Sequence, residues 1–206
     1  VTTICTDKTG TLTMGKMAMT EVRLGSQRYA FRPDAGVVRM YDETGAEVKM
    51  YAPEMTELLK VCAMCNNASV KVNEEGETEY LGDPTEIALL LGAQACGVTK
   101  DAYVAAGNTF VTEVPFDSER KRMSVLFTNG AGEGVVFAKG ACESVLSICT
   151  QNVDGTPLSD AVLKDIEIQL SDMATSGSRV LACAIGTLDM AATPVTNDDN
   201  SAVERG

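Results

Sequence analysis

The chain has 206 residues, a formal net charge of −12 and no histidine. The acidic balance excludes a general surface for nucleic acid or anionic membranes, since both need clustered Lys and Arg. The absence of histidine excludes Ser-His and Cys-His catalysis and any zinc site that uses histidine. Seven scattered cysteines indicate reduced thiols rather than a disulfide framework. No apolar run approaches the roughly 18 residues that a membrane-spanning helix needs.

The first half of the chain predicts hairpins and one helix. A short apolar strand at the start leads into a loop around Asp7. A Gly-Ser pair at 25–26 and an acidic turn at 74–77 each separate two strand-like segments, which is typical of β-hairpins. Pro53 stands at a first-turn position and opens a helix. The strands expected in this half are 20–24, 27–31, 37–41, 47–51, 70–73 and 78–81.

The second half mixes helices and strands. Asp83 and Pro84 predict the start of a helix that Gly97 ends. Strands follow at 111–114, 123–128 and 134–138, then helices at 142–149 and 159–174, then a buried strand at 179–185. Residues 191–206 are rich in Thr, Asn, Asp and Ser, which predicts a surface loop or a disordered end. Because strands and helices do not alternate strictly, we expect an α+β fold, with a mainly antiparallel twisted sheet flanked by helices.

The loop around Asp7 has the chemistry of a phosphoryl acceptor. An Asp carboxylate can attack a terminal phosphate and form an acyl phosphate, which splits one difficult hydrolysis into two easier steps. Lys8 offers a cation to the phosphoryl oxygens, and Thr9 offers a hydroxyl. Gly10 lets the chain turn tightly with its N–H groups facing an anion. We therefore assign catalytic roles to Asp7, Lys8 and Thr9.

The string Asp7-Lys8-Thr9-Gly10-Thr11-Leu12-Thr13 resembles the phosphorylation signature of P-type ATPases, ion pumps that pass through an aspartyl-phosphate. Its continuation, Met14-Gly15-Lys16-Met17, is similar to the type II cation pumps. Gly15 stands where many of those pumps have Asn, and this resembles the sodium/potassium-efflux pumps more than the calcium pumps. The resemblance therefore favours sodium/potassium efflux, with calcium transport next.

The resemblance also implies a domain layout. Residues 1–18 would be a strand, acceptor loop and hinge of the phosphorylation domain, and 19–190 the nucleotide-binding domain. The implied cofactors are ATP and Mg²⁺, and Asp7 and Thr9 would hold the metal in the intact pump. Implied partners are the remaining phosphorylation domain, the actuator and transmembrane domains and the transported cation, with no nucleic acid. We expect a soluble excerpt from the cytoplasmic face of an integral membrane protein, with the plasma membrane favoured.

Two segments each contain a lysine that could contact a nucleotide. In one the lysine follows an aromatic residue, and in the other it precedes a glycine turn. Phe116 lies beside the densest basic cluster of the chain, and an adenine ring needs a π face while its phosphates need cations. The resemblance makes Phe116 the adenine-stacking residue and Lys121 a nucleotide contact, whereas the sequence alone favours a charged hairpin turn that caps a strand. Lys139 and Gly140 end a strand before a helix, and they resemble the Lys-Gly-Ala of the family's ATP pocket. An exposed Lys at an ordinary Gly turn is the alternative.

Three further residues complete the expected pocket. Arg179 resembles the family's phosphate-contacting Arg, and Leu181 would line the adenine slot; a charge at a strand edge is the alternative. Glu86 matches the family's contact to the adenine amino group. It also stands three residues after Asp83, where it would close a capping box at the helix start. One carboxylate cannot serve both roles fully.

We therefore interpret the chain as the ATP-binding part of an enzyme, a P-type cation-transporting ATPase. The phosphates would lie near Lys121, Lys139 and Arg179, and the fragment alone would bind nucleotide without efficient turnover. One alternative is a soluble phosphatase of the haloacid-dehalogenase type, which usually needs a second Asp where this chain has Thr9. The other is a non-catalytic nucleotide-sensing module in which Asp7 is inert.

Overall fold

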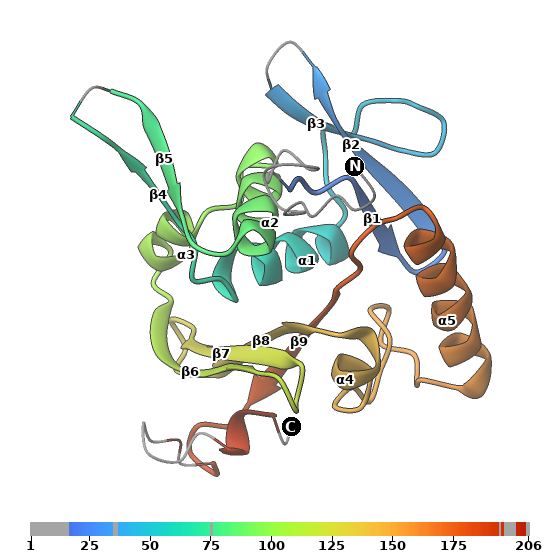
Figure 1. The fold of residues 1–206 in the computed structure, drawn as a ribbon. Helices are drawn as coiled ribbons and strands as arrows, with labels where there is room; N and C mark the ends of the chain where they lie inside the picture. The colour runs from blue at the N-terminus through green and yellow to red at the C-terminus, as the bar shows by residue number, and fades with distance from the viewer. Residues whose placement is uncertain (1–16, 35–36, 75, 194, 196–200, 205–206) are drawn as a thin grey trace, which may run out of the picture.

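The computed structural model describes residues 17–34, 37–74, 76–193, 195 and 201–204. In this part of the chain, three antiparallel sheets surround a central pair of helices (Figure 1). The expected α+β class with antiparallel sheets and flanking helices is confirmed. No helix of the described residues is both long enough and apolar enough to span a membrane.

The first sheet contains β1 (Glu21–Leu24), β2 (Gln27–Asp34) and β3 (Val37–Tyr41), as the sequence predicted. The strand predicted at 47–51 is wrong, because only an isolated bridge joins Tyr41 to Glu47. The Asp42 carboxylate explains this, since it accepts hydrogen bonds from the backbone N–H groups of Thr44 and Ala46. These bonds close a tight turn, so the returning chain meets β3 at one point only.

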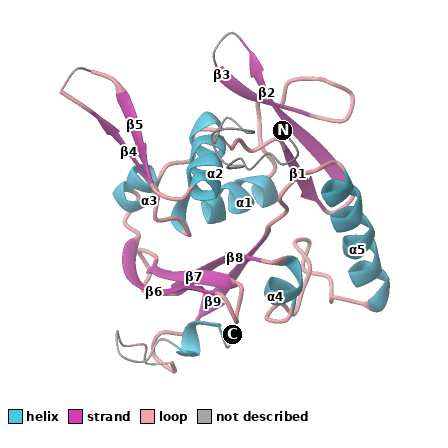
Figure 2. Cartoon of the chain, in the orientation of Figure 1, coloured by secondary structure: helices cyan, strands magenta, loops and turns pink. Residues whose placement is uncertain are grey.

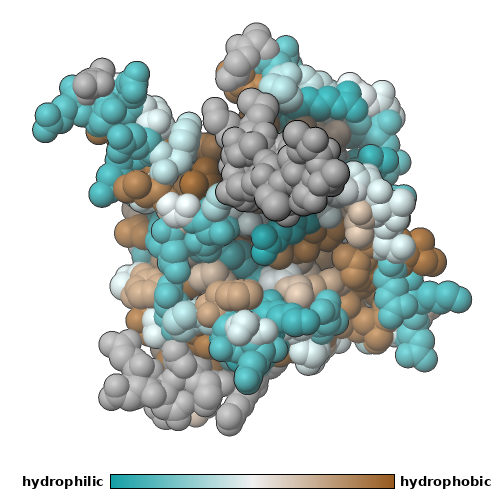
Figure 3. Space-filling model, in the orientation of Figure 1, coloured by the Kyte–Doolittle hydropathy of each residue, from teal (hydrophilic) through white to brown (hydrophobic). Residues whose placement is uncertain are grey.

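Two helices form the centre of the core. They are α1 (Pro53–Met64) and α2 (Pro84–Ala95), each with proline in its first turn, and α1 buries Met55, Leu59 and Cys62 on one side. A short third helix, α3 (Lys100–Ala105), follows with Thr99 as its N-cap, and the sequence analysis did not predict it. The second hairpin, β4 (Ser69–Val72) and β5 (Thr78–Leu81), forms as expected and projects from the helices with mainly hydrophilic side chains (Figures 1 and 3).

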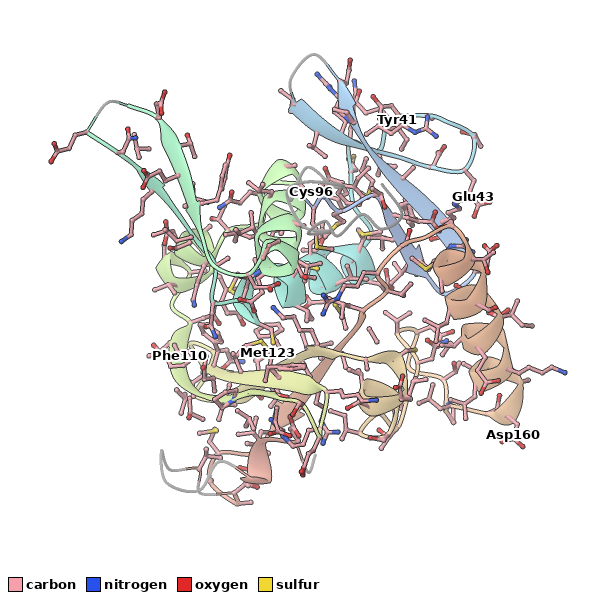
Figure 4. All side chains as sticks on the ribbon, viewed as in Figure 1. Tyr41, Glu43, Cys96, Phe110, Met123 and Asp160 are labelled. Atoms are coloured by element: carbon pink, nitrogen blue, oxygen red, sulfur yellow. The ribbon has the colours of Figure 1, made fainter. Side chains whose placement is uncertain are left out.

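The largest sheet has the order β6-β7-β8-β9, and all of its pairs are antiparallel. Its strands are β6 (Thr109–Asp117), β7 (Arg122–Thr128), β8 (Gly134–Gly140) and β9 (Ala182–Leu188). Alternate residues of a strand face opposite sides of a sheet. Val125 and Phe127 of β7 therefore join the core with α1, whereas Leu126 packs on the other side in a smaller cluster. Figure 4 labels Met123 on the helix-facing side of β7.

The last strand departs from the prediction of a buried strand at 179–185. β9 begins three residues later and lies at the edge of the sheet, where only Leu188 of its residues is buried and Ile185 is 44% exposed. The apolar run at 179–185 indicated burial, but a strand at the edge is covered on one side by a single neighbour. Hydrophobic composition alone does not show which strand ends up there.

Three further helical segments lie in the second half of the described residues (Figure 2). These are α4 (Cys142–Leu146), α5 (Asp160–Thr175) and the 3₁₀ helix η2 (Ser201–Glu204). α5 lies beside β1, where Asp172 forms an ion pair with Arg23 at 2.6 Å. η2 was not predicted, and its Val203 is buried in the smaller cluster on the far side of the large sheet.

Candidate functional site

One end of the large sheet brings most of the predicted nucleotide residues together. The last residues of β6 and β8 and the first residues of β7 and β9 lie at this end. Arg122 at the start of β7 pairs with Asp117 and with Gly140, and Gly140 in turn pairs with Ala182. The predicted residues at or next to this end are Phe116, Lys121, Lys139, Gly140, Arg179 and Leu181. The predicted catalytic residues Asp7, Lys8 and Thr9 lie outside the described residues, so their assignment stays a prediction.

Glu86 and Lys139 form a buried ion pair across the gap between α2 and β8. The Lys139 Nζ lies 2.7 Å from the Glu86 Oε1, and the two side chains are 7% and 16% exposed. The other carboxylate oxygen of Glu86 accepts a hydrogen bond from the Asn67 backbone N–H at 3.2 Å. Both charges are thus compensated, which burial requires. The pair joins the first turn of α2 to the end of β8.

This pairing resolves the two roles expected of Glu86. The Asp83 carboxylate caps α2 by accepting from the Thr85 N–H at 2.8 Å, as predicted. Glu86, however, uses its carboxylate for Lys139 and Asn67, with no bond back to the Asp83 backbone among its contacts. α2 therefore has the Asp83 half of a capping box without the Glu86 half. Long-range pairing with β8 has replaced the local half of the capping box.

Arg179 is an exposed cation close to the start of α2. Burial opposes ionisation of the Asp83 carboxyl, but hydrogen bonds from Thr85 and the charge of Arg179 lower its pKa. Arg179 lies three residues before Ala182, which pairs with Gly140 at the end of β8. Leu181, two residues later, is half-buried. The segment that leads into β9 thus carries a cation and an apolar side chain close to the paired residues Ala182 and Gly140.

The turn between β6 and β7 presents an aromatic ring and an amine to solvent. Phe116 is 62% exposed, and the Lys121 side chain is 59% exposed with its Nζ 3.8 Å from Glu143. The Asp117 carboxylate fixes the turn by accepting from the N–H groups of Glu119 and Arg120, and these bonds lower its pKa. Lys121 has a φ of 53°, a left-handed conformation that costs energy outside glycine.

Gly140 permits a close approach between β8 and this turn. A Cβ atom at this position would lie 2.4 Å from the Lys121 carbonyl oxygen and 2.6 Å from the Arg122 Cα. The Ala141 N–H donates to the same Lys121 carbonyl at 2.9 Å. Glycine is therefore required because backbone occupies the space of a side chain. Its contribution is to let the end of β8 lie directly against the backbone of Lys121 and Arg122.

A second charged cluster, which was not predicted from the sequence, lies behind this turn. Glu204 of η2 lies between Arg120 and Arg122, with its side chain only 9% exposed, and the Ser124 hydroxyl also donates to it. Glu204 is at least 80 residues away from Arg120, Arg122 and Ser124 in the sequence, so no local pattern could have shown the contact. Among the described residues, no group of three or more His, Cys, Asp or Glu side chains could hold a metal ion.

The Glu204 contacts predict a specific pH dependence of stability. Burial opposes ionisation, but hydrogen bonds from Arg122, Ser124 and Arg120 lower the Glu204 pKa in the folded chain. A carboxyl group whose pKa is lower in the folded chain than in the unfolded chain stabilises the fold at pH values above its unfolded pKa, about 4.3. This stabilisation is lost as the pH falls through the folded pKa. We expect the free energy of unfolding of Glu204→Gln to fall less than that of the wild type between about pH 5 and pH 3. Urea unfolding across this range measures it, and parallel curves would contradict it.

The structure defines the class of fold: an α+β domain of antiparallel sheets and helices, whose largest sheet has an exposed aromatic ring and an exposed lysine at one end. The comparisons name the family. Residues 54–205 match the family model described as P-type ATPase, cytoplasmic domain N, and the chain belongs to this family.

Relatives from fungi and bacteria agree with this family. The chain is 38% identical to "Sodium/potassium exporting P-type ATPase cta3" of Schizosaccharomyces pombe, over 93% of this chain and 20% of the relative. It is 30% identical to "Calcium-transporting ATPase" of Bacillus subtilis, over 93% of this chain and 22% of the relative. It is 34% identical to "Probable cation-transporting ATPase F" of Mycobacterium tuberculosis, over 97% of this chain and 22% of the relative. The chain spans about a fifth of the length of these relatives, which are enzymes that transport cations.

Proposed function

We propose that the chain is the ATP-binding domain, with an acceptor loop attached, of a pump that couples ATP hydrolysis to cation transport through an aspartyl-phosphate on Asp7. The observation that carries this proposal is that the buried Glu86–Lys139 pair and the exposed Phe116 lie at the same end of the large sheet. Sodium/potassium efflux is favoured over calcium, since the relative with that name is 38% identical and the calcium-transporting relative is 30% identical.

The side chains at the sheet end fit an adenine nucleotide. An adenine edge offers a donor amino group and ring-nitrogen acceptors, and the Glu86 carboxylate and Lys139 ammonium offer the matching acceptor and donor side by side. Phe116 supplies an uncovered ring on which a base can stack. Because Glu86 compensates the charge of Lys139, we assign Lys139 to the base rather than to the phosphates. Lys121 and Arg179 are exposed cations and fit the phosphates.

In the intact pump, Asp7 would act as the nucleophile. Its carboxylate oxygen forms a bond to the γ-phosphorus, and the bond between that phosphorus and the β,γ-bridging oxygen breaks, with ADP as the leaving group. Asp7 and Thr9 would hold Mg²⁺, which neutralises charge on the transferred phosphoryl group. The partners proposed are the remaining phosphorylation, actuator and transmembrane domains and the transported cation. The plasma membrane is the proposed location.

The first test separates phosphate recognition from base recognition. We expect Lys121→Gln to weaken ATP binding more than AMP binding, because ATP carries more negative charge, and the difference should shrink at high salt. Titration calorimetry with both nucleotides at two salt concentrations measures this. Lys71→Gln is the matched control, since Lys71 is an exposed lysine on the β4–β5 hairpin. Equal losses for AMP and ATP would remove Lys121 from the phosphate site.

The second test concerns catalysis. Binding of ATP by the chain alone, without measurable magnesium-dependent hydrolysis, is the expected result. In the parent pump, Asp7→Asn should abolish the acid-stable phosphoenzyme while nucleotide binding is retained. A phosphoenzyme that persists in this variant would disprove the assignment of Asp7. The complete absence of a phosphoenzyme in the wild-type parent would favour a non-catalytic nucleotide-sensing module.

A further inference from the structure

Glu204 holds the back of the nucleotide-site turn with both of its carboxylate oxygens. The Arg120 Nη1 lies 2.9 Å from each oxygen, and the Arg122 Nη2 lies 2.8 Å from Oε2. The Ser124 hydroxyl donates to Oε1 at 2.5 Å. One carboxylate thus pairs with two guanidinium groups and a hydroxyl that is itself fully buried. Charge-assisted bonds of this kind have more fixed geometry than an exposed pair.

The neighbouring residue anchors Glu204 in place. Val203 is 2% exposed and packs in the small cluster with Leu126, Val136 and Leu188. Ser124 and Leu126 lie on the same face of β7, opposite the face that carries Met123, and Lys139 is the cross-strand partner of Met123. Figure 1 shows η2 on the side of the large sheet away from α1 and α2. The carboxylate therefore approaches the site from the far side of the sheet.

The two arginines that contact Glu204 also form hydrogen bonds within and next to the turn. Arg120 also donates to the Pro115 carbonyl at 2.7 Å, next to Phe116. Arg122 donates to the Ser144 hydroxyl at 3.1 Å, and that hydroxyl bonds back to the Arg120 carbonyl. Lys121, between the arginines, is held in its left-handed conformation. The residues that flank Phe116 and Lys121 are thus fixed through Glu204.

We propose that Glu204 is a positioning residue for nucleotide binding, which sets the conformation of the turn that carries Phe116 and Lys121. This inference rests on the proposed function of the site. The competing view is that Glu204 only neutralises two arginines. In that case its removal would expose positive charge near the phosphates and strengthen ATP binding. The two views predict opposite changes in ATP affinity when Glu204 is replaced.

The experiment compares Glu204→Gln with the wild type by calorimetric titration of ATP and AMP. We expect both nucleotides to bind about tenfold more weakly, because the stacking ring and the lysine lose their position together. Glu119→Gln is the matched control, since it removes the same charge from the exposed side of the same turn. Unchanged binding, or tighter ATP binding, in Glu204→Gln would overturn the proposal.

A second measurement needs no nucleotide. Hydrogen exchange of the Lys121 and Ala141 amides, which donate to the Asp117 and Lys121 carbonyls, reports directly on the turn. We expect faster exchange of these two amides in Glu204→Gln, and not in Glu119→Gln, while amides of α1 stay protected. Unaltered exchange would disprove positioning. If the wild type binds no nucleotide, the proposed function fails, and this measurement still decides whether Glu204 orders the turn.

A milder variant guards against loss of folding. Ser124→Ala removes one hydrogen bond to Glu204 and keeps both arginine contacts. We expect the same direction of change in both nucleotide binding and amide exchange, with binding about two- to threefold weaker. Thermal unfolding of each variant shows that the comparison is made between folded chains. A Ser124→Ala protein that binds ATP as the wild type does, with unchanged exchange, would count against the proposal.

Discussion

Replacing Lys139 by Met is expected to lower the free energy of unfolding by about 3 to 5 kcal/mol, the usual cost of removing one partner of a buried ion pair. The Glu86 carboxylate would remain 16% exposed and would keep only the Asn67 N–H as a contact. Nucleotide binding should fall as well, and by a similar factor for AMP and ATP, because we assign Lys139 to the base. Urea unfolding and titration calorimetry measure the two effects.

Two further variants test the contribution of the Glu86–Lys139 ion pair itself. The double variant Lys139→Met with Glu86→Gln should recover part of the lost stability, since no uncompensated charge is left buried. Lys71→Met, on the exposed β4–β5 hairpin, should change the stability little. Stability of Lys139→Met within about 0.5 kcal/mol of the wild type would show that the ion pair is not formed in solution.

Phe116→Ala is expected to weaken nucleotide binding by about 1 to 3 kcal/mol, the typical worth of one base stacked on an aromatic side chain. The stability of the fold should change little, because the ring is 62% exposed and makes no part of the core. AMP and ATP should lose equally, since both carry the same base. Calorimetric titration with both nucleotides measures the effect.

Phe110→Ala is the matched control, because Phe110 is a 45% exposed ring at the other end of the same strand, labelled in Figure 4. It contacts Phe127 in an edge-to-face arrangement with the ring centroids 5.6 Å apart. Its removal should therefore affect stability more than nucleotide binding. If Phe110→Ala reduced ATP affinity as much as Phe116→Ala, the stacking role of Phe116 would be disproved.

The elements with strong local signals could be predicted from the sequence. Gly25 with φ of 58° closes the first hairpin, and Pro53 and Asp83 open the two central helices. The position of β9 and the existence of η2 could not be predicted. A strand's place in a sheet depends on which partner it meets, and the Glu204 contacts join segments that are far apart in the chain.

The candidate site was predictable in composition but not in its pairing. The resemblance named Glu86 and Lys139 separately, and only the structure shows that they form one ion pair. On account of this contact, we propose the base rather than the phosphates as the partner of Lys139. The roles of all the site residues remain proposals, and those of Asp7, Lys8 and Thr9 rest on the sequence alone.

The late position of β9 in the chain has a consequence for biosynthesis. Residues of the site come from α2, from the β6–β7 turn, from the end of β8 and from the segment before β9, and this last part joins only when Ala182 pairs with Gly140. Such non-local pairing forms slowly, because a long intervening segment must first be closed into a loop. A nascent chain that ends at α5 would have the aromatic ring and both lysines but lack Arg179 and Leu181. If the chain binds ATP as we propose, nucleotide affinity would report whether the large sheet has been completed, and ATP would favour the finished domain over its partly folded precursors.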